Sequence, residues 1–342
     1  MVHAPTIGLH NDAEVLTQAL SCAIPGIEVH SLDIPWNPNL DFTTPTDVPD
    51  EIASVAPFDV TFLLEHLYGH PPLRSRHFAL RRVFVPNAEW LMPQDEAELQ
   101  LHPPDVILYK NEFSRERCRA IPGFAAVADQ VTGWTSHDFP APANSAFTKD
   151  FRTFLHVRGV SAQKHASVVL ETWLQNPDFP TLTLICAAHD EFSVPVPLKA
   201  AHNVQIIMRN LPLEELRVHQ HANGVHVYPS YAEGFGHALN ETRICSSVLV
   251  TTCAPPMEDL VRPGETGFLV SVDAADTGPF RRGTRFPVRA AALADTIREV
   301  LATPVERLRA IGCRAREGYR LDQQRFYSAV RRLCHQVGLS NG

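Results

Sequence analysis

The first 110 residues alternate between short apolar runs and a segment whose apolar residues have helical spacing. A helix is predicted over residues 12–20, with Asp12 as its N-cap and Val15, Leu16, Ala19 and Leu20 on its apolar side. Runs rich in β-branched and aromatic residues predict strands at residues 5–9, 27–32, 58–64, 82–86 and 104–109. Strand, helix and strand at this spacing predict an α/β fold with a parallel, doubly wound sheet.

The alternation stops at residues 138–146, which contain two prolines and several small residues and therefore predict a linker. It resumes beyond them, with strands predicted at 152–157, 181–186, 203–207, 224–228 and 248–252, and helices at 165–174, from Gly236 onward and at 322–337. A chain of 342 residues is long enough for two domains that each bury a core. We therefore expect Rossmann-like domains at residues 1–145 and 146–321, followed by a final helical segment at 322–342.

Residues 228–241 combine the end of a strand, a glycine-containing turn and the start of a helix. Gly234 and Gly236 keep the turn free of Cβ atoms. Glu233 lies in this turn, and Glu241 lies in the second turn of the helix, roughly 7–8 Å beyond Gly236 along the axis. The unpaired N–H groups and the positive end of the helix dipole lie between the two carboxylates and suit an anion. This order matches the polarity of a sugar, a diphosphate and a ribose.

The spacing of Glu233 and Glu241, with Gly-Phe-Gly after the first, resembles the E-x7-E motif of family-4-like retaining glycosyltransferases, which belong to glycosyl transferases group 1. The resemblance covers about residues 151–272 and includes the segments 203–216 and 257–270. An ordinary strand–turn–helix unit with surface glutamates is the alternative interpretation. The resemblance implies a GT-B fold, in which two Rossmann-like domains face each other across a cleft and the terminal helix packs back towards the N-terminal, acceptor-binding domain.

The resemblance also implies which residues bind a nucleoside diphosphate sugar in the second domain. Glu233 would hold hydroxyls of the donor sugar, and Glu241 would accept hydrogen bonds from the ribose. Lys164 matches a family lysine that binds the donor diphosphate, and Arg158 is expected to be a second cation, although the family order Gly-Arg is reversed here. The residues expected to complete the donor site are Phe235 and Gly236 through their backbone amides, Gly234, Gly159, and Met208 and Leu211 beside the base.

Polar residues follow two predicted strands of the first domain. In an open α/β sheet, ligands bind beyond the carboxyl ends of the strands. We therefore expect Glu65, His66, Asn87 and Glu89 to contact the acceptor. The family commonly has a histidine where this chain has Asn87-Ala88-Glu89, so no histidine is carried over to that loop. The alternative is that these residues only cap loops.

The formal net charge of −8 is unevenly distributed, because residues 1–150 carry −11 and the remainder carries +3. An acidic first half disfavours nucleic acid and anionic membranes as its partners, so a soluble acceptor is expected in preference to a membrane lipid. No apolar run has transmembrane length, and no basic residue precedes Arg74, so neither a span nor a targeting segment is expected. Seven cysteines without paired spacing indicate free thiols and a cytoplasmic location.

The residue pattern does not indicate a metal site or a cofactor. Although there are 17 histidines, His219, His221 and His226 have no cysteine pair or carboxylate that would complete a metal site. No metal and no cofactor are expected, because Lys164 and a helix N-terminus suffice for the charge of a diphosphate leaving group. The predicted activity is hexosyl transfer from a nucleotide sugar to a hydroxyl group with retention of configuration. The alternatives are another GT-B activity, such as a nucleotide-sugar epimerase or a phosphorylase, and a catalytically silent subunit that binds nucleotide sugar.

Overall fold

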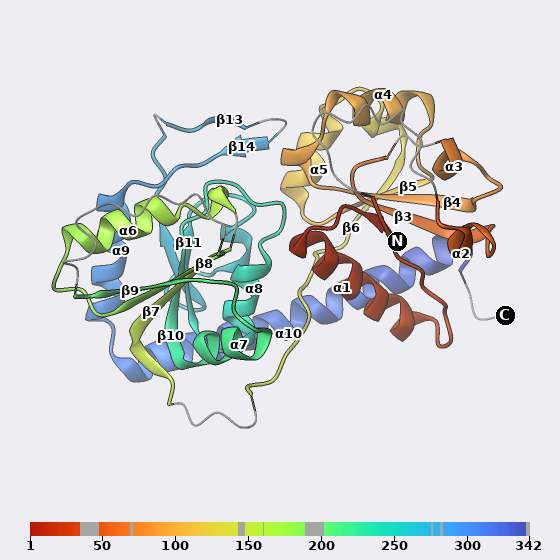
Figure 1. Cartoon of the computed structure of the whole chain (residues 1–342). Coiled ribbons are helices and arrows are strands. Elements are labelled where there is room, and N and C mark those ends of the chain that lie inside the picture. Colours follow the sequence, from red (N-terminus) through yellow and green to blue (C-terminus); the bar gives the residue numbers. More distant parts are fainter. Residues whose placement is uncertain are drawn as a thin grey trace. The chain divides into compact units, whose positions relative to one another are not determined.

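A computed structural model describes residues 1–34, 48–68, 71–142, 148–159, 161–188, 202–274, 276–280 and 283–339. The chain divides into two compact units, of which unit 1 comprises residues 1–137, 279–283 and 322–342, and unit 2 comprises residues 138–278 and 284–321 (Figure 1). Within the described residues, each unit contains a six-stranded sheet whose neighbouring strands are all parallel. The prediction of an α/β fold with doubly wound parallel sheets is therefore confirmed.

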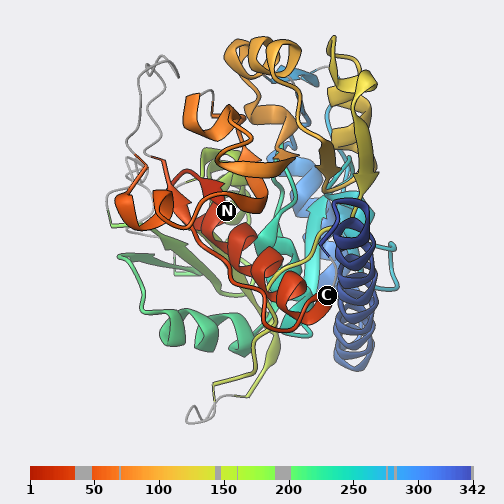
Figure 2. The ribbon, with the colours of Figure 1, turned by 90° about the vertical axis from the view of Figure 1, so that its right-hand side faces the viewer.

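The sheet of unit 1 has the strand order β2-β1-β3-β4-β5-β6. Its strands are β1 (Val2–His3), β2 (Leu32–Asp33), β3 (Phe58–Glu65), β4 (Ala79–Pro86), β5 (Val106–Tyr109) and β6 (Ala128–Val131). The helices are α1 (Ile7–Ala23), α2 (Asp50–Ala53), α3 (Pro71–Arg74), α4 (Pro93–Leu101) and α5 (Glu112–Arg119), with 3-10 turns η1 (Ala88–Trp90) and η2 (Phe124–Ala126). Helix α1 packs against β1 and β3, beside which it runs in Figure 2, and α5 packs against β5.

The beginning of unit 1 differs from the prediction. The strand predicted at residues 5–9 is wrong, because the Thr6 side chain accepts a hydrogen bond from the Leu9 backbone N–H at 3.3 Å and starts helix α1 there. The first strand is instead the two-residue β1. Asp12, predicted as the N-cap, lies inside α1 and is buried. The strand predicted at residues 27–32 is likewise reduced to the two residues of β2.

The sheet of unit 2 has the strand order β12-β11-β10-β7-β8-β9. Its strands are β7 (Asp150–Gly159), β8 (Leu182–Cys186), β9 (Val204–Met208), β10 (Asn223–Tyr228), β11 (Val248–Thr252) and β12 (Gly267–Val270). Short strands β13 (Gly278–Phe280) and β14 (Gly283–Arg285) follow. The helical elements are α6 (Ala166–Gln175), α7 (Leu213–Ala222), α8 (His237–Ile244), α9 (Ala290–Ala302) and α10 (Val305–Gln336), with 3-10 turns η3 (Ala162–Lys164) and η5 (Glu258–Leu260).

Most predicted strands of unit 2 are confirmed to within two residues, and β11 has the predicted bounds. The pattern did not predict β6 or β12, which are short edge strands. The predicted linker lies partly outside the described residues, since only 138–142 and 148 onward are described, and residues 138–142 form neither helix nor strand.

The large core of unit 2 lies between the sheet and helices α6, α9 and α10. Phe154 of β7 and Trp173 of α6 meet edge to face, with ring centroids 5.2 Å apart. Ile297 of α9 and Leu308 of α10 are fully buried in the same cluster. Helix α10 continues beyond this core, because its residues from Asp322 onward belong to unit 1. There the ring of Phe326 lies 4.9 Å from that of Trp134. Among the described residues, none of the helices is both long and apolar enough to cross a membrane.

Candidate donor and acceptor sites

Glu233 lies in the turn between β10 and α8 and is half-buried. The Ser230 hydroxyl donates a hydrogen bond of 2.8 Å to its Oε1 atom. Burial raises the pKa of the Glu233 carboxyl above its ordinary value, while the charge of Lys164, the Ser230 hydrogen bond and the charge of His237 act in the opposite direction. Two residues predicted from sequence, Glu233 and Lys164, are therefore close enough to interact electrostatically.

Lys164 is the last residue of η3, between β7 and α6. Its Nζ atom donates a hydrogen bond of 3.2 Å to the Val157 carbonyl and lies 6.0 Å from the centre of the Tyr228 ring. The backbone holds this turn against the motif, because the Tyr231 N–H donates to the Gln163 carbonyl at 3.0 Å. Lys164 thus lies between the carboxyl ends of β7 and β10, where a parallel sheet binds its ligands.

Arg158 and Gly159 end strand β7 on the same edge of the sheet. Arg158 is 9% exposed. Burial lowers the pKa of the neighbouring His156 to about 3, and the positive charges of Lys164 and Arg158 contribute to this shift. The two predicted cations therefore share one region. Gly159 has φ of +57°, the left-handed conformation that favours glycine.

The start of α8 depends on Gly236, which is its N-cap with φ of +90°. A Cβ atom at this position would lie 3.2 Å from Cδ1 of Leu239, so Leu239 would have to shift, and the positive φ would strain any residue with a side chain. Phe235 is buried, and Gly234 is half-buried. The predicted helix start is confirmed, and it leaves the first backbone N–H groups of α8 directed towards the turn that contains Glu233.

Glu241 lies in the second turn of α8 and its carboxylate is held by two residues of α7. Gln220 Nε2 donates to Glu241 Oε2 at 2.7 Å, and Arg217 Nη1 lies 3.5 Å from Glu241 Oε1. Neither α7 residue was predicted. They lie 21 and 24 residues before Glu241, so no local sequence pattern could have linked them to it.

Met208 and Leu211, predicted to flank a nucleotide base, lie at and just after the carboxyl end of β9. Met208 is 43% exposed. Strand β9 is three positions from β10 in the sheet, which corresponds to roughly 14 Å at the usual strand spacing. These two residues are therefore on the predicted edge but well separated from the glutamate motif.

In unit 1, three of the four residues predicted to contact the acceptor lie together. Asn87 Nδ2 donates to Glu65 Oε1 at 2.8 Å, and Nε2 of His66 lies 3.8 Å from Glu65 Oε2. Burial raises the pKa of the Glu65 carboxyl, opposed by the charges of His66 and Lys110 and by the Asn87 hydrogen bond. Glu65 also has φ of +70°, an uncommon conformation for a residue with a side chain.

The fourth residue, Glu89, is buried in η1; burial raises the pKa of the Cys118 thiol of α5, and the charge of Glu89 raises it further. Asp95 was not predicted from the sequence. Its carboxylate accepts a hydrogen bond from the Leu67 N–H at 2.8 Å and contacts His66 Nδ1 at 2.8 Å.

A buried ion pair also lies close to Glu65. The Lys110 ammonium contacts the Asp12 carboxylate, and both side chains are 4% exposed. These two charges act on the pKa of Glu65 in opposite directions, Lys110 lowering it and Asp12 raising it. The ammonium also lies 5.2 Å from the centre of the Trp134 ring.

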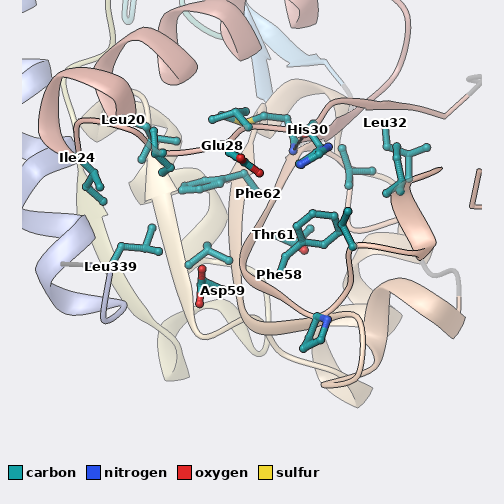
Figure 3. Close-up of a pocket in the computed structure, with 18 of the residues that line it drawn as sticks. Leu20, Ile24, Glu28, His30, Leu32, Phe58, Asp59, Thr61, Phe62 and Leu339 are labelled. Carbon is teal, nitrogen blue, oxygen red and sulfur yellow. Dashed lines mark hydrogen bonds between the residues drawn. The ribbon is translucent and has the colours of Figure 1, made fainter. Parts of the chain in front are cut away.

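A separate cavity of about 520 Å³ lies in unit 1 (Figure 3). Its apolar walls include Leu20, Ile24, Phe62 and Leu339, and it is lined by the amino-terminal half of β3. Glu65 is at the opposite end of that strand, so this cavity is not part of the polar cluster. Within the described part of the chain, no group of three or more histidine, cysteine or carboxylate residues could hold a metal ion.

The fold of this chain is similar to the folds of several solved structures. A glycosyltransferase from Rickettsia africae has a TM-score of 0.69 at 12% identity, covering 99% of this chain and 98% of that one. Sucrose-phosphate synthase from Thermosynechococcus elongatus has a TM-score of 0.68 at 18% identity, covering 98% and 94%. HepE from Anabaena, solved with UDP-glucose, has a TM-score of 0.51 at 16% identity, covering 75% and 71%. The fold is therefore that of GT-B glycosyltransferases.

A family model matches part of the sequence. Residues 141–277 match the family model of glycosyl transferases group 1. Unit 2 therefore contains a region that matches glycosyl transferases group 1, in a chain that has the GT-B fold. No curated protein sequence matches the chain. Some similar structures are longer, since this chain spans 58% of the matched chain in the GtfA/B complex.

Proposed function

We propose that this glycosyltransferase transfers a sugar from a nucleoside diphosphate sugar to a hydroxyl group, with retention of configuration and without a metal ion. The observation that carries the proposal is the electrostatic interaction of Lys164 with Glu233, with Glu241 on helix α8, which begins four residues after Glu233. The nucleotide-sugar donor is also supported by the structural likeness to HepE, which was solved with UDP-glucose.

In this proposal each end of the motif binds a different part of the donor. Glu233 accepts hydrogen bonds from the sugar hydroxyls, assisted by the backbone N–H groups of Phe235 and Gly236. Lys164 and Arg158 bind the diphosphate, and Glu241 accepts hydrogen bonds from the ribose. Met208 and Leu211 form part of the surface beside the base. Gly159 and Gly234 allow the backbone to approach the ligand.

The reaction requires position and charge rather than a protein nucleophile. The bond between the anomeric carbon and the diphosphate oxygen breaks, and the acceptor oxygen forms the new bond on the same face of the sugar. The acceptor proton passes to the leaving diphosphate. Lys164 and Arg158 stabilise the negative charge that develops on that group, which is usually the largest contribution to catalysis of this kind. Orientation of the acceptor supplies the rest.

We further propose that Glu65, His66, Asn87 and Glu89 of unit 1 serve the acceptor, and that the acceptor is soluble. The arginines of this unit support the second point, because six of the seven between Arg74 and Arg119 contact carboxylates of the same unit. The remaining one, Arg117, lies over the ring of Phe113. Because three carboxylates pair with six arginines, the preference for a soluble acceptor also depends on the net charge of −11 over residues 1–150, which disfavours an anionic membrane. Seven free thiols are consistent with a cytoplasmic location.

The proposal is tested by thermal-shift screening of UDP-, GDP-, ADP- and TDP-sugars, followed by a hydrolysis and transfer assay with each donor that stabilises the protein. Stabilisation by one nucleotide and its sugar, with slow release of that sugar to water, is the expected result. Binding without sugar release to water or to any hydroxyl acceptor would contradict transferase activity and favour a subunit that only binds nucleotide sugar. Absence of binding to every nucleotide would overturn the proposed donor class.

A further inference from the structure

The carboxylate of Glu241 is held by two side chains of α7. Gln220 and Arg217 each contact one of its oxygens, at 2.7 and 3.5 Å, and Arg217 Nη1 also donates to Gln220 Oε1 at 2.7 Å. Arg217 and Glu241 are mostly buried, with side chains 16% and 18% exposed. A carboxylate has about four acceptor positions, so two remain for further donors.

An aromatic ring packs on the guanidinium of Arg217. Its Cζ atom lies 3.3 Å from the centre of the Phe139 ring, and the ring of His221 meets Phe139 edge to face at 5.7 Å. The preceding residue, Asp138, makes two hydrogen bonds with Arg316, at 2.7 and 2.9 Å. The first residues of unit 2 are thus anchored to α7 and α10, and Arg217 lies between this anchor and Glu241.

We propose that Arg217 is a positioning residue that presents the Glu241 carboxylate to the ribose diol of the nucleotide, and that Phe139 holds Arg217 in place for this purpose. This inference rests on the proposed function. A planar guanidinium can stack on Phe139 and contact Glu241 at the same time, which the compact ammonium of lysine cannot do. A carboxylate already oriented by Arg217 and Gln220 loses less freedom when it binds the diol.

The contact between Arg217 and Phe139 links residues 138–142 to nucleotide binding. If ribose binding favours the arrangement in which Arg217 contacts both Glu241 and Phe139, then anchoring of residues 138–142 and nucleotide binding must assist each other, since coupling between two equilibria is reciprocal. A substitution at Phe139 is therefore expected to weaken nucleotide binding, although Phe139 contacts no nucleotide in this proposal.

The test compares the affinities of ribonucleotides and 2′-deoxyribonucleotides. Calorimetry with UDP, GDP, ADP and TDP first identifies the nucleotide that the unaltered chain binds, and its ribose and 2′-deoxyribose forms are then compared. Arg217→Ala is expected to weaken binding of the ribonucleotide by about 10-fold and of the deoxy form by less than about 3-fold, because the lost orientation acts through the diol. Arg217→Lys and Phe139→Leu should give smaller losses in the same direction.

Arg298→Ala is the matched control, because Arg298 also lies over a phenylalanine ring, Phe179, and pairs with a carboxylate on α9. It should bind both nucleotides as the unaltered chain does. Equal losses for the two nucleotides in Arg217→Ala and in Arg217→Lys would assign Arg217 a structural role and overturn the inference. Unchanged affinities in both variants would do the same. If the unaltered chain binds none of UDP, GDP, ADP and TDP, the proposed donor class fails instead, which distinguishes the two failures.

Discussion

The Ser230 hydroxyl donates a hydrogen bond of 2.8 Å to Oε1 of Glu233, three residues further along the chain. This bond lowers the pKa of Glu233, whereas burial raises it more strongly. If the ionised carboxylate binds the donor sugar, activity declines as the pH falls through this raised pKa. The acidic limb of the pH–rate profile should therefore lie above the range of an ordinary glutamate.

Ser230→Ala should move that limb further towards neutral pH, because one interaction that favours the ionised form is lost. Turnover at neutral pH is expected to fall about 10- to 100-fold, because a hydrogen bond to a charged group contributes about 1.5–3 kcal/mol. The measurement is a pH–rate profile of both proteins. A profile in Ser230→Ala that coincides with the original would show that Glu233 does not control the acidic limb.

Lys164→Ala should lower turnover by at least ~100-fold at saturating donor, since removing one stabiliser of a developing charge has an effect of this size. Lys164→Arg should retain part of the activity. Arg320→Ala, which removes one exposed positive charge from the same unit, serves as the control and should have normal turnover. Near-normal turnover in Lys164→Ala would remove this residue from the catalytic machinery.

The two glutamates of the motif should respond differently to substitution. Glu241→Gln is expected to weaken binding of the bare nucleoside diphosphate, because its carboxylate contacts the ribose in our proposal. Glu233→Gln should leave that affinity nearly intact while abolishing transfer. Calorimetry with the nucleoside diphosphate, combined with a transfer assay, separates the two cases. Equal loss of nucleotide affinity in both variants would mean that the donor lies in the opposite direction along the motif.

Three buried histidines of unit 2 should make the protein sensitive to acid. Burial lowers the pKa of His156 and His226 to about 3 and that of His221 to about 4. These histidines remain neutral when folded, but they bind protons when unfolded below about pH 6.5. The stability that depends on their neutral form is present above that pH and is lost as the pH falls towards 4.

His226→Gln isolates one of these contributions. Glutamine can still bond to the carbonyl groups of Gln220 and Asn223, which His226 contacts at 2.9 and 3.2 Å. The free energy of unfolding by urea should decline less steeply between pH 6 and 4.5, by up to about 1.4 kcal/mol per pH unit. His202→Gln, at an exposed position, should keep the original slope. A His226→Gln slope equal to the original would contradict this origin of acid sensitivity.

A soluble acceptor predicts weak membrane association. Co-sedimentation with vesicles that contain anionic lipid should recover little of the protein, because residues 1–150 carry a net charge of −11 and six of the seven arginines between Arg74 and Arg119 pair with Asp105, Glu98 or Asp129. Neutral vesicles provide the reference. Binding that is specific to anionic vesicles and declines with added salt would contradict the soluble-acceptor proposal.

How well the sequence predicted each element depended on how far apart the determining residues lie. Strand β11 and the start of α8 follow from an unbroken apolar run and from Gly236, so local patterns sufficed. The beginning of the chain was misread because Thr6, rather than Asp12, caps the first helix. In a two-residue strand such as β1, there is too little sequence for a period to be recognised.

Prediction of the site also depended on how far apart its residues lie in the sequence. Glu233, Lys164 and Glu241 could be predicted because their surroundings resemble a known motif. Asp95 could not be predicted, because it lies in the first turn of α4 and contacts a residue 29 positions earlier, His66. Glu89 was grouped with Asn87 by proximity in sequence, but the turn of η1 buries it beside Cys118.

Helix α10 contributes to both units, and this determines how the enzyme could be recombined with its relatives. Residues 1–137 lack the aromatic partner Phe326 that packs on Trp134. The segment 141–277 lacks Ile297, Leu308 and the other helical residues that close the core of unit 2. A hybrid protein with an exchanged unit 1 would therefore need at least two junctions, near residues 137 and 321. A gene fusion with a single crossover would leave one hydrophobic face uncovered and is expected to aggregate.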